Sequence, residues 1–414
     1  MSAIPHRVVV TGLSVASALG FEIEPFWSAL LAGRSGIARL PQIADDSPLP
    51  TKYAGHIDNT ALAAALAPFQ IDDPDRSNQL ALYAVGRALA DAGLPTDGQR
   101  ELEAEMILGT GHGNSAFNTE SARAFFGGGY RKLRPTAVVR LMFNRPAHLA
   151  SIRYKLTGGS FVVCCACATG SIAFGEAFHK IRFGLAERAV AACADSGLDI
   201  GTFSAWNRLG ILSRNPDPER ACRPFDRDRD GLVMGEGAAG FVLESLAAAQ
   251  QRGARIYAEV LGYGCTSDAH HIVKPAPAGQ VRAIRKALAE GGVTPPEVDY
   301  INAHGTATQL ADVVEAATLR EVFGAHAEVV PVSNTKAQLG HLMGATAGVE
   351  LVATLTAMQR NEIAPCRNLD HPDPRCPLNF VRGQPLQRPV RIALKNSFAF
   401  GGTNSAILLR QFAG

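Results

Sequence analysis

Short runs of β-branched and other apolar residues alternate with alanine-rich segments of helical period along most of this chain. Strands are predicted at 6–11, 105–109, 189–194, 256–263, 298–302, 329–332, 391–394 and 405–409, and helices at 77–93, 280–290 and 345–360. Because strands that alternate with helices usually return as parallel neighbours, this pattern predicts an α/β protein with helices packed over a mainly parallel sheet.

The chain is long enough for two cores. Its 414 residues exceed the size at which a single core usually stops growing. The segment QRGAR at 251–255 separates a predicted helix from the strand that opens a second series of elements. We therefore expect an N-terminal half over residues 1–253 and a C-terminal half over residues 254–414.

Composition excludes several classes of protein. Lys and Arg total 40 against 38 Asp and Glu, a net charge of +2, which does not favour a nucleic-acid partner. The start lacks the pattern of a signal peptide, and no apolar run reaches the length of a membrane helix. Eight cysteines in a chain of this length do not indicate a disulfide framework. We expect a soluble cytoplasmic protein that binds neither nucleic acid nor membrane.

One cysteine lies where a nucleophile would. The segment FVVCCACATGSIAFGEAFHKIRF at 161–183 predicts a strand that ends at Cys167, a turn of small residues, and then a helix. A strand–turn–helix elbow exposes a nucleophile in this way, and the helix dipole should lower the pKa of the thiol. Two alternatives remain, a buried structural cysteine or a redox or zinc half-site at Cys164 and Cys167. The second is disfavoured because the sequence has no other CxxC pair.

Two histidines follow predicted strands. His304 lies in AHGTAT after the strand at 298–302, and His341 follows NTKAQLG after the strand at 329–332. Open α/β sheets place their chemistry at such strand ends. Either histidine alone could have a structural role. No third ligand lies near enough in the sequence to complete a metal site, so we expect no metal. Together with Cys167 and Lys336 they form a candidate catalytic group.

The segment KNSFAFGGTN at 395–404 predicts a flexible loop between the last two strands. It could supply a backbone N–H and a movable aromatic wall, or it could be an ordinary glycine turn.

Several motifs now match one family in order. They are ACATG around Cys167, PFDRDRDGLVMGEGA from Pro224, AHGTAT, NTKAQLGH, Glu350 and NSFAFGGTN. With these the chain resembles the beta-ketoacyl-[acyl carrier protein] synthases of the elongating type, nearly from end to end. The resemblance implies the thiolase-like fold, with five αβαβα layers in two pseudo-symmetric halves.

The resemblance also implies a reaction. Cys167 would take an acyl group from acyl carrier protein, and malonyl-carrier would then lose carbon dioxide. The resulting enolate would attack the acyl-cysteine and give a 3-oxoacyl-carrier. His304 and His341 would hold the charge on the enolate oxygen, which agrees with what two imidazole N–H donors can do.

Further roles follow from the same resemblance. Lys336 would tune the field at the histidines, with Glu350 and Asp312 in support. The backbone amides of Cys167 and Phe400 would form an oxyanion hole. The remaining assignments are Phe398 and Phe400 as a gate and Thr306 and Thr308 as contacts of the pantetheine arm. No cofactor is expected beyond the phosphopantetheine of the carrier protein, and the enzyme would be a homodimer or a heterodimer with a chain-length factor.

Some residues depart from the family pattern. Ala399 stands where a glycine is usual, Ala311 replaces a common Asn and Val273 a common Thr. His112 falls at the acyl pocket, where the fatty-acid enzymes have an apolar residue, which argues against a long saturated chain. Fatty-acid elongation is therefore weighed against a ketosynthase subunit of a discrete (type II) polyketide or aryl-polyene pathway. A non-catalytic partner usually lacks the cysteine, and a thiolase would need a second cysteine in place of the second histidine, so both are disfavoured.

Overall fold

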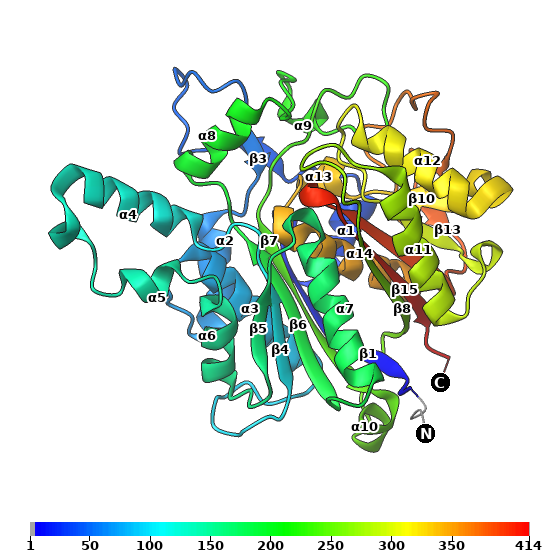
Figure 1. Cartoon of the computed structure of the whole chain (residues 1–414), viewed down its shortest axis with the longest axis horizontal. Helices are drawn as coiled ribbons and strands as arrows, with labels where there is room; N and C mark the ends of the chain where they lie inside the picture. The colour runs from blue at the N-terminus through cyan, green and yellow to red at the C-terminus, as the bar shows by residue number, and fades with distance from the viewer. Residues whose placement is uncertain (1–4, 414) are drawn as a thin grey trace.

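The computed structural model describes residues 5–413 (Figure 1). Eleven strands form one continuous sheet in the order β12-β10-β9-β14-β15-β8-β1-β7-β6-β4-β5. Those of the N-terminal half are β1 (Val8–Ala16), β4 (Glu105–Gly109), β5 (Ser160–Val163), β6 (Arg188–Asp195) and β7 (Gly237–Ser245). Those of the C-terminal half are β8 (Ala258–Ser267), β9 (Tyr300–Asn302), β10 (Pro331–Ser333), β12 (Asn379–Phe380), β14 (Ile392–Phe398) and β15 (Thr403–Gln411).

The two halves repeat one pattern of strand pairing. In the N-terminal half, β5–β4 and β4–β6 are parallel, whereas β6–β7 and β7–β1 are antiparallel. In the C-terminal half, β10–β9 and β9–β14 are parallel, whereas β14–β15 and β15–β8 are antiparallel. Only three residue pairs, between β1 and β8, join the halves into one sheet. The pseudo-symmetric halves implied by the resemblance are confirmed.

The expectation of a mainly parallel sheet is wrong, because half of the strand pairs are antiparallel. Strand β15 follows β14 after a turn of four residues, so the chain reverses without a crossover helix. Strand β7 likewise returns antiparallel to β6 after a long loop segment. Such returns are not visible in the alternation of strand and helix, since they depend on where a loop leads.

Helices cover the sheet in layers (Figure 1). Helices α3 (Arg76–Asp91) and α6 (Arg145–Tyr154) pack on the outer side of the N-terminal half, and α11 (Pro277–Gly291) and α12 (Ala311–Phe323) on that of the C-terminal half. Helices α7 (Thr169–Arg182) and α14 (Thr346–Arg360) pack against each other between the halves. The predicted helices at 77–93, 280–290 and 345–360 are thus α3, α11 and α14, shifted by one to three residues at their ends.

Close approach of α7 and α14 depends on small residues. A Cβ atom on Gly170 would lie 2.8 Å from the backbone nitrogen of Gly348. A Cβ on Gly348 would lie 2.3 Å from Sγ of Cys193 in β6. Larger side chains would separate the two inner helices, and these helices begin next to the functional loops.

The remaining elements lie around this framework. An arm that contains α4 (Ser115–Gly128) and α5 (Ala137–Leu141) projects from one side of the body (Figure 1). The other helices are α1 (Ile23–Leu31), α2 (Asn59–Leu66), α8 (Ile200–Leu209), α9 (Pro218–Ala221), α10 (Leu246–Gln251) and α13 (Lys336–Leu339). Two small two-stranded antiparallel sheets pair β2 (Ile37–Arg39) with β3 (Tyr53–Gly55) and β11 (Glu362–Ile363) with β13 (Leu386–Gln387). None of the helices in residues 5–413 is long and apolar enough to cross a membrane.

Candidate active site

Cys167 lies on a tight turn between β5 and α7, as the elbow pattern predicted. The turn is the 3-10 segment Ala166–Ala168, and Ala166 has φ +46°. The Thr169 hydroxyl oxygen accepts the backbone N–H of Cys165 at 2.8 Å and so closes the turn. Cys167 is buried, whereas Cys164 is exposed, so the two do not form one site.

The expected low pKa of the Cys167 thiol is wrong. Burial raises this pKa to about 11, although the backbone N–H of Phe400 and the charge of Lys336 act in the opposite direction. Desolvation outweighs these favourable interactions, so the thiolate form of Cys167 is disfavoured. Cys167 is therefore a neutral thiol when no substrate is bound. It would lose its proton to the departing carrier thiolate as the acyl group is transferred.

His304 follows β9 and faces His341 across the pocket. The two ring centroids are 5.6 Å apart with an interplanar angle of 84°, and the Phe398 ring lies 6.1 Å from His304. The carboxylate of Glu315, on α12, accepts the backbone N–H groups of His304 and Gly305, each at 2.7 Å. These two bonds fix the loop that carries His304.

His341 presents one ring nitrogen to the pocket. Its Nδ1 accepts the backbone N–H of Met343 at 3.2 Å and lies 2.7 Å from the Thr346 hydroxyl. A nitrogen that accepts an N–H carries no proton, so the proton of the neutral ring is on Nε2. Nε2 is buried and makes no hydrogen bond within residues 5–413, which leaves it as a donor for a substrate oxygen.

Both imidazoles are kept neutral. Burial lowers the pKa of His304 and of His341 well below the ordinary value, and the positive charge of Lys336 lowers each further. A neutral ring beside a fixed positive charge suits stabilisation of a developing oxyanion, because its N–H donates without a prior proton transfer.

A buried charge cluster lies behind the histidines. Lys336 Nζ is 2.7 Å from Glu350 Oε1 and also donates to the His304 carbonyl. Lys395 Nζ is 2.9 Å from Glu350 Oε2. These residues do not line the pocket, and the predicted roles of Lys336 and Glu350 stay predictions. The sequence analysis did not single out Lys395, although it opens the KNSFAFGGTN motif.

Thr306 and Thr308 also line the pocket. Their hydroxyl oxygens are 2.9 Å apart, and Asp312 accepts the backbone N–H of Thr306 at 2.9 Å. Arg229, fully buried, donates to the carbonyl oxygens of Thr308 and Gln309, each at 2.9 Å. Arg229 belongs to the PFDRDRDG motif, whose contribution to the site could not be read from the sequence.

The loop that follows β14 forms another wall. Phe398, Ala399 and Phe400 line the pocket. Ala399 is extended, with φ −120°, so alanine fits there without strain, and the turn itself uses Gly401 at φ +83°. The backbone N–H of Gly401 donates to the Ile272 carbonyl at 2.7 Å, which ties this loop to the segment after β8.

His112 is not among the residues that line this pocket. Trp206, on α8, lines it instead and donates its indole N–H to His112 Nε2 at 3.1 Å. The role of His112 in the acyl pocket therefore stays a prediction. His112 contacts Trp206, and Trp206 lines the pocket. No sequence signal had drawn attention to Trp206.

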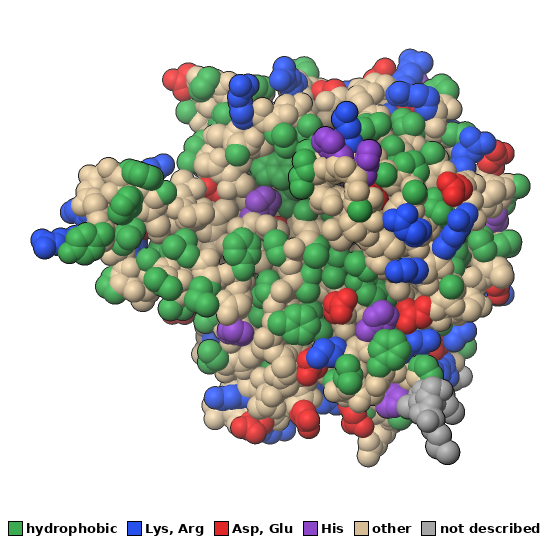
Figure 2. Space-filling model, in the orientation of Figure 1, with side chains coloured by type: hydrophobic (Ala, Val, Ile, Leu, Met, Phe, Trp, Pro, Cys, Tyr) green, Lys and Arg blue, Asp and Glu red, His purple; other side chains and the backbone are tan. Residues whose placement is uncertain are grey.

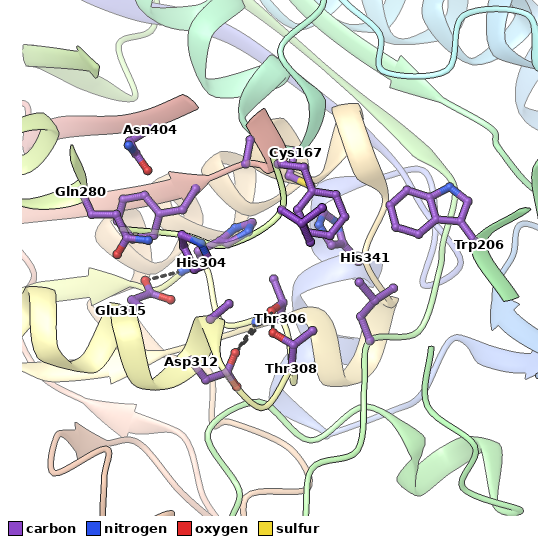
Figure 3. A pocket seen from close by; sticks show the side chains of 17 residues that line it. Cys167, Trp206, Gln280, His304, Thr306, Thr308, Asp312, Glu315, His341 and Asn404 are labelled. Atoms are coloured by element: carbon purple, nitrogen blue, oxygen red, sulfur yellow. Dashed lines mark hydrogen bonds between the residues drawn. The ribbon is translucent and has the colours of Figure 1, made fainter. Parts of the chain in front are cut away.

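One pocket brings these parts together (Figure 3). Its lining comprises Cys167, Trp206, Leu232, Val273, Pro275, Gln280, His304, Thr306, Thr308, Ala311, Asp312, Glu315, His341, Phe398, Ala399, Phe400 and Asn404. Of these, Glu315, Gln280 and Asn404 were missed by the sequence analysis. Burial raises the pKa of Glu315 to about 7, against the effect of its two backbone N–H bonds. A buried thiol and two neutral imidazoles on one apolar pocket can carry an acyl group and stabilise an enolate.

Comparison with known proteins agrees with this site. The model of the beta-ketoacyl synthase N-terminal domain matches residues 6–249, and that of the C-terminal domain matches residues 257–370. The 3-oxoacyl-[acyl-carrier-protein] synthase 2 of Coxiella burnetii is 36% identical over 98% of this chain and 99% of its own. The enzyme of the same name from Synechocystis is 36% identical over 98% of both chains.

Solved structures of ketosynthases are also similar to this chain. The ishigamide ketosynthase/chain length factor superposes with a TM-score of 0.91 at 33% identity, over 99% of this chain and 100% of that one. A beta-ketoacyl synthase from Burkholderia phymatum superposes with a TM-score of 0.90 at 32% identity, with the same coverage. The fold and the site define a condensing acyltransferase of the thiolase-like fold. The chain belongs to the beta-ketoacyl synthase family.

Proposed function

We propose that this protein is a 3-oxoacyl-[acyl carrier protein] synthase that elongates an acyl chain by decarboxylative condensation. The observation that carries the proposal is the convergence of Cys167, His304 and His341 on one pocket, from the segments that follow β5, β9 and α13. The phosphopantetheine arm would come from the carrier protein, as a substrate and not as a resident cofactor.

In the first half-reaction, Cys167 attacks the acyl thioester. A new carbon–sulfur bond forms at Cys167, the bond to the carrier thiol breaks, and the thiol proton ends on the released carrier. The backbone N–H groups of Cys167 and Phe400 would hold the tetrahedral oxyanion. The raised pKa of the thiol agrees with a nucleophile that loses its proton only as the substrate reacts.

In the second half-reaction, malonyl-carrier loses carbon dioxide and leaves an enolate. His341 Nε2–H and an N–H of His304 would hold the negative oxygen, while Lys336 adds a positive field behind them. The enolate carbon then attacks the acyl carbonyl, the carbon–sulfur bond to Cys167 breaks, and the thiolate takes up a proton. Thr306 and Thr308 would hold the pantetheine arm during both steps, with Asp312 fixing their loop.

The experiment that tests this function is mass spectrometry of the protein after incubation with acyl-carriers and malonyl-carrier. We expect an acyl mass on Cys167 and a 3-oxoacyl-carrier product. Cys167→Ala should abolish condensation, while malonyl decarboxylation persists. Cys164→Ala is the matched control, since Cys164 is exposed three residues away and lines no part of the pocket. Elongation by Cys167→Ala would contradict the assignment.

Two pathways remain candidates, because relatives of both kinds match. The curated relatives bear the name of a fatty-acid elongation enzyme, which favours that pathway. The ishigamide structure and a type II polyketide ketosynthase captured with its acyl-carrier protein favour a polyketide or polyene pathway. The acyl mass that accumulates on Cys167 would decide between them.

The carrier protein would dock on a basic face. Lys274, which lies between the pocket-lining residues Val273 and Pro275, is exposed, as are the α11 residues Arg282 and Lys286, and Figure 2 shows Lys and Arg side chains over this half of the molecule. An acidic carrier would be attracted to such a face, and salt would screen the attraction. We place this reaction in the cytoplasm, where the eight free thiols would stay reduced.

A second subunit would cover the arm and the neighbouring sheet edge. Strand β5 ends the sheet and pairs only with β4. Eight large apolar residues are exposed between 125 and 143, among them Phe126 at 85% and Val138 at 73% (Figure 2). Apolar surface on this scale beside a free strand edge is typical of an interface. We propose a dimer, with a second copy or with a chain-length factor.

A further inference from the structure

Trp206 closes one end of the Cys167 pocket with a flat aromatic wall. Its indole stacks on the Phe400 ring, with centroids 6.1 Å apart and planes inclined by 16°. Phe400 in turn directs its backbone N–H toward the Cys167 thiol. A displacement of Trp206 would therefore remove a contact of Phe400, the residue whose backbone N–H faces the Cys167 thiol.

A hydrogen bond to His112 holds Trp206 in this position. The indole N–H donates to His112 Nε2 at 3.1 Å. An indole can only donate, so His112 Nε2 must be unprotonated, and the proton of the neutral ring is on Nδ1. Nδ1 lies 3.4 Å from Oδ1 of Asp195.

His112 is itself rigidly placed. Its backbone N–H donates to Asp195 Oδ1 at 3.0 Å, and Asp195 also accepts the backbone N–H of Gly344 at 2.8 Å. On its other side Gly197 leaves just enough room, because a Cβ there would lie 2.8 Å from Nδ1 of the ring. The acceptor of the indole N–H is thus anchored to the turn that follows His341.

We propose that the His112–Trp206 hydrogen bond is a latch that limits the length of the acyl chain accepted by Cys167. Acyl groups that end before Trp206 load without disturbing it. A longer chain must break the bond and swing the indole away from Phe400. This inference rests on the proposed acyl transfer and names the residues that set its chain-length specificity.

The test compares loading of Cys167 from a mixture of short, medium and long saturated acyl-carriers, read by mass spectrometry. Trp206→Phe keeps an aromatic wall but removes the donor, and His112→Ile removes the acceptor. Each should raise the ratio of long to short chains on Cys167 by roughly fivefold, the effect of one hydrogen bond. The double variant should shift the ratio no further than either single variant, because both lose the same bond. His112→Gln offers an amide oxygen to the indole and should stay closer to the wild type.

Fluorescence supplies a second measurement that does not depend on substituting the latch. The chain has two tryptophans, and Trp27→Phe leaves Trp206 as the only indole. Trp27 lies elsewhere, with its N–H 3.4 Å from Glu362, so this variant is also the control for chain-length preference. Loading with a long chain should change the emission of Trp206, whereas loading with a short chain should not.

The outcomes separate the two proposals. If the wild type carries acyl groups but Trp206→Phe leaves the chain-length ratio unchanged, or the two single effects add in the double variant, the latch is wrong and the acyl transfer stands. Equal emission after short and long loading also overturns the latch. If no acyl mass forms on Cys167 in the wild type, the proposed function fails, and the latch fails with it.

Discussion

Burial sets the protonation state of the three residues proposed to be catalytic. The same desolvation that raises the pKa of Cys167 lowers that of His304 and His341, so all three are uncharged at neutral pH. The fixed charges nearby are paired with one another in the Lys336–Glu350–Lys395 cluster. The site is thus prepared to stabilise charge that develops during the reaction, since it carries little charge of its own at the reacting atoms.

The raised pKa of Cys167 predicts its response to pH. Alkylation by iodoacetamide requires the thiolate, so its rate at Cys167 should rise about tenfold per pH unit from neutrality toward a pKa of about 11. Site-resolved mass spectrometry would follow Cys167 in a Cys164→Ala background. A rate that levels off near neutral pH would show that the start of α7 outweighs burial after all.

The histidines should act as separate donors to the enolate. His304→Ala and His341→Ala should each lower malonyl decarboxylation by about 10²–10³-fold, as removal of one oxyanion donor does elsewhere. Release of carbon dioxide from malonyl-carrier measures this without the acyl-transfer step. Full retention of decarboxylation by either variant would remove that histidine from the mechanism. His326, partly buried and bonded to the Val298 carbonyl at 3.0 Å, provides a control substitution outside the pocket.

At the scale of elements, the two halves build the site from equivalent turns. Ala166 before Cys167 has φ +46°, and Met343 shortly after His341 has φ +49°. Each turn leads into an inner helix whose first residue is a threonine, Thr169 in α7 and Thr346 in α14. Packing of α7 against α14 therefore brings the nucleophile of one half to the histidine loop of the other.

The contact between α7 and α14 should tolerate no larger residue at Gly348. The Gly348→Ala variant would place a Cβ 2.3 Å from Cys193 Sγ, and we expect it to lower the free energy of unfolding by about 1–3 kcal/mol. Gly127→Ala is the matched control, because Gly127 lies in α4 with nothing within 4 Å of its Cβ position. That variant should be neutral or raise the free energy of unfolding by about 0.5–1 kcal/mol. Chemical denaturation of both proteins would measure the difference.

At the scale of the whole molecule, three residue pairs between β1 and β8 continue the sheet from one half to the other. The halves also meet through α7 and α14 and through side chains such as Arg229, which donates to the Thr308 carbonyl. The repeated pairing pattern supports the division at residues 253 and 254, which stays a proposal. The exposed arm and the edge of β5 form the surface that we propose contacts a second subunit.

Substitutions on the arm test the proposed dimer. Phe126→Ser combined with Val138→Ser should convert a dimer to a monomer, as measured by analytical ultracentrifugation at micromolar concentration. Val329→Ser removes a residue that is 61% exposed on the C-terminal half and should leave the association unchanged. A wild type that sediments as a monomer would contradict the interface.

Carrier docking should depend on charge. Binding of an acidic carrier protein should weaken as salt is raised, and Arg282→Glu should weaken it further at low salt. Arg100→Glu reverses an exposed charge in the loop before β4, where Arg100 lies 3.9 Å from Asp97, and it should have little effect. Binding that stayed constant across the salt titration would argue against the basic face.

The sequence by itself determined the order of the elements, the elbow at Cys167 and the strand-end positions of His304 and His341. These features depend on periodicity, turn chemistry and motif order, all of which are set by residues that are close together in the sequence. The tertiary structure alone decided the mixed pairing of the sheet, the raised pKa of Cys167, and the contacts of Trp206, Glu315, Lys395 and Arg229. Each of these follows from distant segments packing together, because burial and long-range hydrogen bonds are properties of the folded core. His112 shows the difference most clearly, since its position in the sequence suggested the acyl pocket, but only the fold showed that its ring accepts the indole N–H of Trp206, which lines the pocket in its place.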